Sequence, residues 1–199
     1  MGNVTTRKYY RFFGGFLTAQ ERWLNKMADR GCRLVRTEKL LYEFEGCAPG
    51  QVRYRMEFIG GKSKLSAAQY RGFLEDMGYR VFYKNINLNY SVGKVRLRPW
   101  AEKGGRIATN STTFNRELLI VEKVNDGKPF ELHSTYEDRI KYCRSLRAPW
   151  LFLFAMSVAL GILARAWLGG VFAVFSLVPL ALYQLELIRL GKEARTREW

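Results

Sequence analysis

The sequence predicts an α+β domain followed by a pair of membrane helices. The expected fold of the domain is ferredoxin-like, a split βαβ antiparallel sheet with two helices and an extra β-hairpin. The C-terminal part is expected to be a two-helix transmembrane hairpin. Two observations support this prediction. Strand and helix patterns follow one another through residues 7–88 in the order strand, helix, strand, strand, helix, strand, and residues 148–188 are apolar almost throughout.

The first strand and the first helix are predicted within residues 7–31. The segment "RKYYRFF", residues 7–13, has the aromatic composition of a strand. Thr18 and Glu21 then have the spacing of a capping box, and Gly31 is expected to end the helix. The apolar positions of this helix lie on one face: Trp23, Leu24, Met27 and Ala28.

Two strands joined by the turn "CAPG" are predicted next, over residues 40–46 and 51–60. Apolar and charged residues alternate in both, so one face of each strand is expected in the core. The charged positions are Glu43, Glu45, Arg53, Arg55 and Glu57. On a ferredoxin-like sheet they would share the face without helices, where opposite charges pair across strands.

A second helix is predicted to begin at Ser66, with Gln69 completing its capping box, and to end at Gly78 before the strand "YRVFYKNINL". The two helix ends "MADRGCRLV" and "LEDMGYRVF" superpose, with Gly31 on Gly78. This internal echo favours a pseudo-repeated fold.

Residues 86–117 are predicted to be a loop insertion, with one hairpin around Gly93. Residues 118–124 are strand-like, and residues 130–132 are expected to return beside them after the turn at Asp126 and Gly127. Cations in the loop are interleaved with an aromatic residue, a composition that suits nucleic acid. Near a membrane such a loop more often contacts anionic headgroups or solvent, so no specific nucleic acid is expected.

The membrane hairpin is predicted from two uncharged runs that are separated by Arg165. Each run is close to the length that spans a bilayer, and Trp150 and Trp167 fall where aromatic rings prefer the interface. Basic residues cluster before and after the hairpin. The residues expected at the membrane interface are Arg144, Arg147, Trp150, Trp167, Arg189 and Lys192. The positive-inside rule then places both termini in the cytoplasm, at the cytoplasmic membrane.

The predicted organisation has four parts. They are a cytoplasmic domain over residues 1–133, a basic linker helix over 134–147, the transmembrane hairpin over 148–188 and a basic tail over 189–199. The net charge of +15 favours an acidic partner, anionic headgroups of the lipid bilayer among them.

No catalytic, cofactor-binding or metal-binding residue is predicted. The three cysteines, Cys32, Cys47 and Cys143, lie far apart, and the single histidine, His133, has no partner at a recognisable spacing. The sequence therefore favours a protein that is not an enzyme.

Four segments carry a resemblance to a known family. They are "ERWLNKMADRGCRLV", "YEFEGCAPGQVRYRMEF", "YRGFLEDMGYRVFYK" and "GKPFELHSTYEDRIKY". In these blocks the chain resembles the bacterial domain-of-unknown-function family numbered 2812, whose members look like an α+β domain followed by membrane helices. Cys32 stands where an aromatic residue is commoner. The resemblance implies an association with PadR-like transcriptional regulators and no known activity.

The expected function is that of a non-enzymatic, membrane-anchored regulatory or sensory protein whose cytoplasmic domain binds a partner. The candidate partner-binding residues are Trp23, Arg53, Arg55, Glu43 and Glu45. Two other classes stay open: a membrane-surface enzyme acting on lipid or peptide, and a nucleic-acid-binding module. A homo-oligomer formed by edge-to-edge pairing of sheets also stays open.

Overall fold

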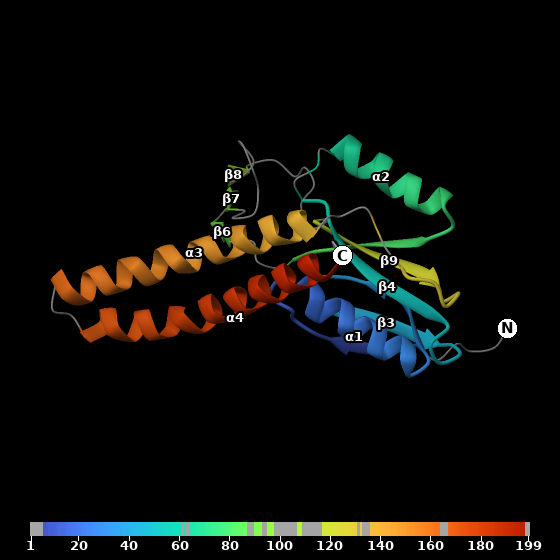
Figure 1. Cartoon of the computed structure of the whole chain (residues 1–199), viewed down its shortest axis with the longest axis horizontal. Helices are drawn as coiled ribbons and strands as arrows, with labels where there is room; N and C mark the ends of the chain where they lie inside the picture. Colours follow the sequence, from blue (N-terminus) through green and yellow to red (C-terminus); the bar gives the residue numbers. More distant parts are fainter. Residues whose placement is uncertain are drawn as a thin grey trace. The chain divides into compact units, whose positions relative to one another are not determined.

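In the computed structural model the chain forms two compact units, Met1–His133 and Ser134–Trp199 (Figure 1). The described residues are 6–60, 62, 64–86, 90–92, 95–97, 107–108, 117–130, 132, 136–163 and 167–197.

The strands described in the first unit form three-stranded antiparallel sheets. In the first sheet the order is β1 (Arg7–Tyr10), β3 (Leu41–Gly46), β2 (Cys32–Thr37). In the second it is β4 (Val52–Phe58), β9 (Leu118–Val124), β5 (Arg80–Lys84). A small third sheet contains β6 (Tyr90–Val92), β7 (Val95–Leu97) and β8 (Ile107–Ala108). Val92 pairs with Val95, which confirms the predicted hairpin around position 93.

The α+β class is confirmed, but the ferredoxin-like topology is not. The sequence indicated an extended segment after Gly31, but the prediction did not count it as a strand, and the structure shows that it forms β2. Because β3 pairs with β1 on one side and with β2 on the other, it has no free edge for β4. β4 therefore pairs with β9, and the strands divide into two sheets instead of one.

Helix α1 (Leu17–Asp29) begins one residue before the predicted N-cap, at the N-cap residue Phe16, which makes no side-chain capping bond. The predicted capping box of Thr18 and Glu21 is therefore wrong. The Glu21 carboxylate instead accepts hydrogen bonds from the Met56 backbone N–H at 3.1 Å and from Arg55 Nη1 at 2.6 Å. This residue joins α1 to β4.

The second edge of β4 is satisfied by α1. Asn25 Nδ2 donates to the Tyr54 carbonyl, and the Tyr54 N–H donates to Asn25 Oδ1, both at 2.9 Å. With Glu21 on the Met56 N–H, side chains of the helix occupy the positions where a further strand would pair. The helix thus takes the place of a neighbouring strand.

A buried hydrogen-bond chain connects the two main sheets. The Leu34 N–H of β2 donates to the Tyr54 hydroxyl at 2.7 Å, and this hydroxyl donates to Glu122 Oε2 of β9 at 2.8 Å. Arg33 Nε donates to the other oxygen of Glu122 at 2.8 Å. Tyr54 and Glu122 are both almost fully buried, so each needs these partners.

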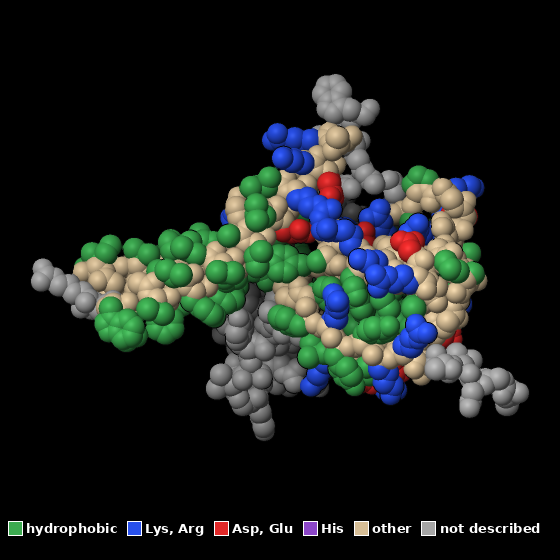
Figure 2. Space-filling model, turned by 90° about the horizontal axis from the view of Figure 1, so that it is seen from below, with side chains coloured by type: hydrophobic (Ala, Val, Ile, Leu, Met, Phe, Trp, Pro, Cys, Tyr) green, Lys and Arg blue, Asp and Glu red, His purple; other side chains and the backbone are tan. Residues whose placement is uncertain are grey.

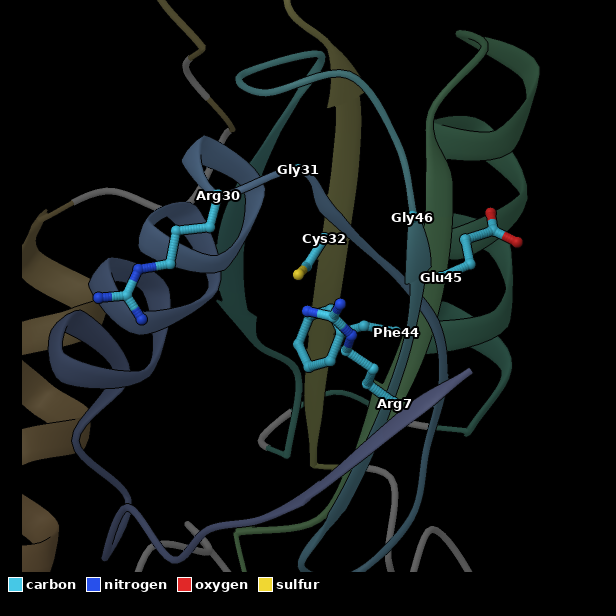
Figure 3. Close-up of a pocket in the computed structure, with 7 residues that line it drawn as sticks. All are labelled: Arg7, Arg30, Gly31, Cys32, Phe44, Glu45 and Gly46. Carbon is cyan, nitrogen blue, oxygen red and sulfur yellow. The ribbon is translucent and has the colours of Figure 1, made fainter. Parts of the chain in front are cut away.

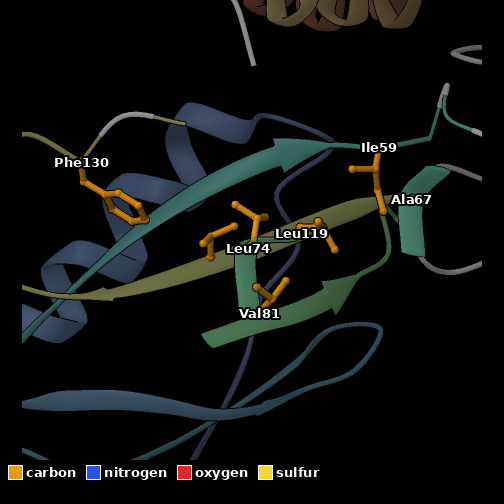
Figure 4. Packing of buried hydrophobic residues seen from close by; sticks show 7 residues of the cluster. Ile59, Ala67, Leu74, Val81, Leu119 and Phe130 are labelled. Atoms are coloured by element: carbon orange, nitrogen blue, oxygen red, sulfur yellow. The ribbon is translucent and has the colours of Figure 1, made fainter. Parts of the chain in front are cut away.

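Helix α2 (Lys64–Asp76) covers one face of the second sheet. Helices α1 and α2 lie on opposite sides of the strands (Figure 1). Helix α2 begins two residues before the predicted cap at Ser66. The buried cluster beneath it contains Ile59, Ala67, Leu74, Val81, Leu119, Val121 and Phe130 (Figure 4). Phe130, which the sequence predicts within a returning strand, packs into this cluster instead.

The second unit consists of two long helices, α3 (Tyr136–Leu163) and α4 (Trp167–Arg197), that contact each other extensively. Both are long and apolar enough to span a membrane. Residues 136–147 of the predicted linker and the first apolar run belong to one continuous helix, α3, and residues 189–197 of the predicted tail form the end of α4.

Small residues bring the two helices close together. A Cβ atom at Gly169 would lie 2.5 Å from the Gly161 nitrogen and 2.7 Å from the Ser157 carbonyl oxygen. The buried hydroxyls of Ser157 and Ser176 donate to carbonyls of their own helices. These bonds satisfy polar groups that a bilayer could not solvate.

Replacing Asn25 by Ala is expected to lower the free energy of unfolding by about 1–3 kcal/mol, because both backbone groups of Tyr54 lose their partner. Urea unfolding of the detergent-solubilised full-length protein would measure this. The matched control is Gln69→Ala, which removes an exposed amide from α2. Equal effects of the two changes would contradict the role assigned to Asn25.

Replacing Gly169 by Ala is expected to destabilise the helix pair by about 1–3 kcal/mol, because the added methyl group meets backbone atoms of α3. Gly170→Ala is the control, since a Cβ there meets nothing within 4 Å. Thermal unfolding in detergent, followed by circular dichroism at 222 nm, should show a lower midpoint for Gly169→Ala only.

Candidate functional site

Trp23 lies at the centre of an aromatic cluster between α1 and the first sheet. Its ring centroid is 4.9 Å from that of Tyr42, 5.5 Å from Phe13 and 5.6 Å from Phe44. The Arg11 guanidinium carbon lies 5.2 Å from the Trp23 ring centroid. Trp23 is half-buried, so its ring serves mainly to pack the helix on the sheet.

A groove opens beyond the C-terminal end of α1, with a volume of about 510 Å³ (Figure 3). Its lining residues are Arg7, Arg30, Gly31, Cys32, Phe44, Glu45 and Gly46. The strand register explains the lining, because Arg7 is opposite Phe44 and Cys32 is opposite Gly46. Residues paired in this way project from the same face of a sheet.

The surface around α1 is strongly basic. Figure 2 shows Lys and Arg side chains around a hydrophobic area on the side of the first unit seen from below Figure 1. The exposed cations of α1, of its C-cap and of β1 and its flank are Arg7, Lys8, Arg11, Arg22, Lys26 and Arg30. Such a surface favours an anionic ligand or partner.

The candidate residues Arg53 and Arg55 contact α1. Arg53 Nη1 lies 2.9 Å from Asp29 Oδ1, and Arg55 bonds the Glu21 carboxylate and the Phe130 carbonyl. Both arginines therefore help to hold the helix against β4. Reversing their charges would disturb this packing as well as any binding surface.

The candidate residues Glu43 and Glu45 belong to the other sheet. Glu43 pairs with Lys8 of β1 at 3.4 Å, and Glu45 lies opposite Arg33 in the strand register. The single charged face predicted across the strands at 40–46 and 51–60 therefore does not form, since the two pairs of candidate residues lie in different sheets.

Lys84 is a buried amine that the sequence did not indicate. Its Nζ donates to the Glu38 carbonyl and lies 3.9 Å from the centroid of the Tyr42 ring. Burial lowers the pKa of Lys84 from 10.5 to about 7. The sequence "RVFYK" of β5 gives no sign of this burial, because Lys84 is buried by its contacts with Tyr42 and Glu38, residues distant in the sequence.

The cysteines are free thiols in the structure, and Cys32 and Cys143 are buried. Burial raises the pKa of Cys47, which disfavours its thiolate. Across the described ranges, no group of three or more His, Cys, Asp or Glu residues is arranged to hold a metal ion.

The interface candidates lie along the two long helices. Arg147 donates to Gln184, and Arg189 pairs with Glu193 at 2.9 Å. Arg144 and Lys192 are exposed. Trp150 packs on Phe175 with ring centroids 6.4 Å apart, whereas Trp167, at the start of α4, is 77% exposed.

The lowered pKa of Lys84 predicts a pH dependence of stability. Between pH 7 and 10.5 the unfolded chain binds this proton and the folded protein does not, so stability should rise with pH by up to about 1.4 kcal/mol per unit. Lys84→Met should remove this rise, whereas Lys26→Met, at an exposed position, should keep it. Denaturant unfolding at pH 7, 8 and 9 would measure the slopes, and identical slopes for all three proteins would contradict the assignment.

Comparison with known proteins gives one match. No curated protein and no solved structure matches the chain. The family model described as protein of unknown function (DUF2812) matches residues 17–155, which include α1, α2, every strand of the two main sheets except β1, and the first part of α3. This range covers more than half of the chain and agrees with the resemblance seen in the sequence. The chain therefore belongs to the DUF2812 family.

Proposed function

We propose that this protein is a membrane-anchored regulatory or sensory protein, not an enzyme, whose first unit binds a partner protein in the cytoplasm. The observation that carries the proposal is the combination, in one chain, of a folded α+β domain with two helices that are long and apolar enough to span a bilayer. Such an arrangement confines a binding domain to the membrane surface.

The anchor is the hairpin of α3 and α4. Large apolar side chains are exposed along both helices, from Leu151 to Ile188, which is a surface suited to lipid. The Cys143 thiol donates to the Tyr183 carbonyl, which places the start of α3 beside the second half of α4. The basic residues before and after the hairpin thus fall at the same end, as the positive-inside rule requires of a cytoplasmic end. The bilayer would be the inner membrane.

The binding surface that we favour is an apolar stripe on α2. Leu65 and Phe73 of α2 are 69% and 46% exposed, and Met77, in the turn directly after α2 and four residues beyond Phe73, is 52% exposed. Exposed apolar residues on one helix face are typical of a protein-binding surface. Unlike Trp23, Arg53 and Arg55, these residues can be changed without removing a bond between α1 and the sheets.

The partner class that we favour is a PadR-like transcriptional regulator, as the family resemblance implies. A DNA-binding protein held at the membrane is kept away from its operators, so docking on this domain would regulate transcription. The family relationship supports this partner by analogy, and the exposed stripe provides a surface for it.

In-cell photocrosslinking would test this function. A benzoylphenylalanine placed at Gln69, an exposed position on α2, should capture a PadR-like regulator in cells that express the full chain. The double change Leu65→Glu and Met77→Glu should abolish the capture, because charges replace the apolar contact. Leu40→Glu, an equally drastic change at an exposed leucine of the turn between β2 and β3, should leave it intact.

Two outcomes would contradict the proposal. Capture of only lipid and further copies of this chain would leave a lipid-responsive or enzymatic role. Capture of a regulator that persists in the double variant would move the binding surface away from α2.

A further inference from the structure

The groove beyond α1 presents a positive charge over an apolar floor. In Figure 3 the Arg7 guanidinium lies near the Phe44 ring, and the Cys32 thiol is directed into the groove. Phe44 and Cys32 are buried, so they form the floor, while Arg7 is exposed at the rim. Arg30, at the C-cap of α1, also borders the groove, but its guanidinium points away from it in Figure 3.

The acid in this lining, Glu45, does not neutralise Arg7. Glu45 is next to Phe44 in β3, and neighbouring strand residues project to opposite faces. Its carboxylate accordingly points away from the groove in Figure 3, toward the face on which it lies opposite Arg33. Among the residues that the structure describes, no ion pair involves Arg7 or Arg30.

The groove is also open enough for a ligand. Its volume of about 510 Å³ is in the range of small-molecule sites. Gly46 lines it without a side chain, and a Cβ atom built there would meet nothing within 4 Å. Two carbonyls at the C-terminal end of α1 already have partners, because Met27 accepts a hydrogen bond from the Arg30 N–H and Ala28 accepts from Gly31 and Gly50.

We propose that this groove binds a phosphate group, with the guanidinium of Arg7 as its ligand. Guanidinium groups match phosphate oxygens in pairs of parallel hydrogen bonds, which makes arginine the preferred residue for this chemistry. The phosphate belongs either to the headgroup of an anionic lipid or to a soluble molecule. The groove is separate from the apolar stripe on α2, so this chain would bind a phosphate group in addition to the proposed partner protein.

Protection of the Cys32 thiol provides the measurement, because a ligand in the groove lies over the sulfur. The full-length protein is placed in nanodiscs, and alkylation of Cys32 by iodoacetamide is followed by mass spectrometry with Cys47 as the internal reference. In one arm the nanodiscs contain only phosphatidylcholine and inorganic phosphate is added, with chloride at equal ionic strength as the control. In the other arm the nanodiscs contain phosphatidylglycerol and no phosphate is added.

Two variants and two matched controls make the assay specific. Arg7→Gln should weaken protection by roughly tenfold or more in phosphate concentration, as expected for the loss of a charge-assisted bond. Gly46→Leu should abolish it by filling the groove. Arg22→Gln, at an exposed arginine outside the groove, and Gly72→Leu, at a glycine of α2 with equally open surroundings, should retain wild-type protection. Unfolding curves confirm that each variant is folded.

Slower alkylation of Cys32 in either arm, lost in Arg7→Gln and Gly46→Leu, supports the site. Protection by inorganic phosphate identifies a soluble ligand, and protection only by phosphatidylglycerol identifies a lipid headgroup. Unchanged alkylation in both arms, or protection that persists in Arg7→Gln, overturns the proposal. Neither result affects the crosslinking at α2, so the two proposals fail independently.

Discussion

The fold of the first unit depends on how the second edge of β4 is satisfied. Its first edge pairs with β9, and the obvious partner for the other edge, β3, is enclosed between β1 and β2. Asn25 and Glu21 of α1 bond the backbone that remains. A buried strand edge without partners would cost several hydrogen bonds, so the position of α1 follows from this need. The aromatic cluster around Trp23 and the groove at the end of the helix both result from that position.

The sequence indicated the elements more reliably than their pairing. The apolar face of α1, the alternation in β4 and the uncharged runs of α3 and α4 are local patterns, and each predicted the correct element. The pairing of strands depends on long-range competition for edges, which has no local pattern. A single missed strand, β2, therefore changed the expected topology from one sheet to two.

The same distinction applies to the candidate site. Arg53, Arg55 and Glu45 stood out because they are charged residues in alternating strands, but the structure uses the two arginines to bond α1. Arg7, Cys32 and Gly46 carried no signal in the sequence as a group, since they belong to three strands that only the register brings together. The buried Lys84 was also concealed, because its neighbours on β5 gave no sign that both faces are covered.

The continuity of α3 has a mechanical consequence. Because one helix extends from Tyr136 through Leu163, roughly 42 Å at 1.5 Å per residue, it has no flexible joint where the basic part meets the apolar part. Pro149 removes one hydrogen bond from this rod but does not interrupt it. A turn of the rod about its long axis at the bilayer would therefore rotate its basic end by a similar angle. The helix can therefore transmit a rotation from its apolar part to its basic part, in addition to tethering the chain.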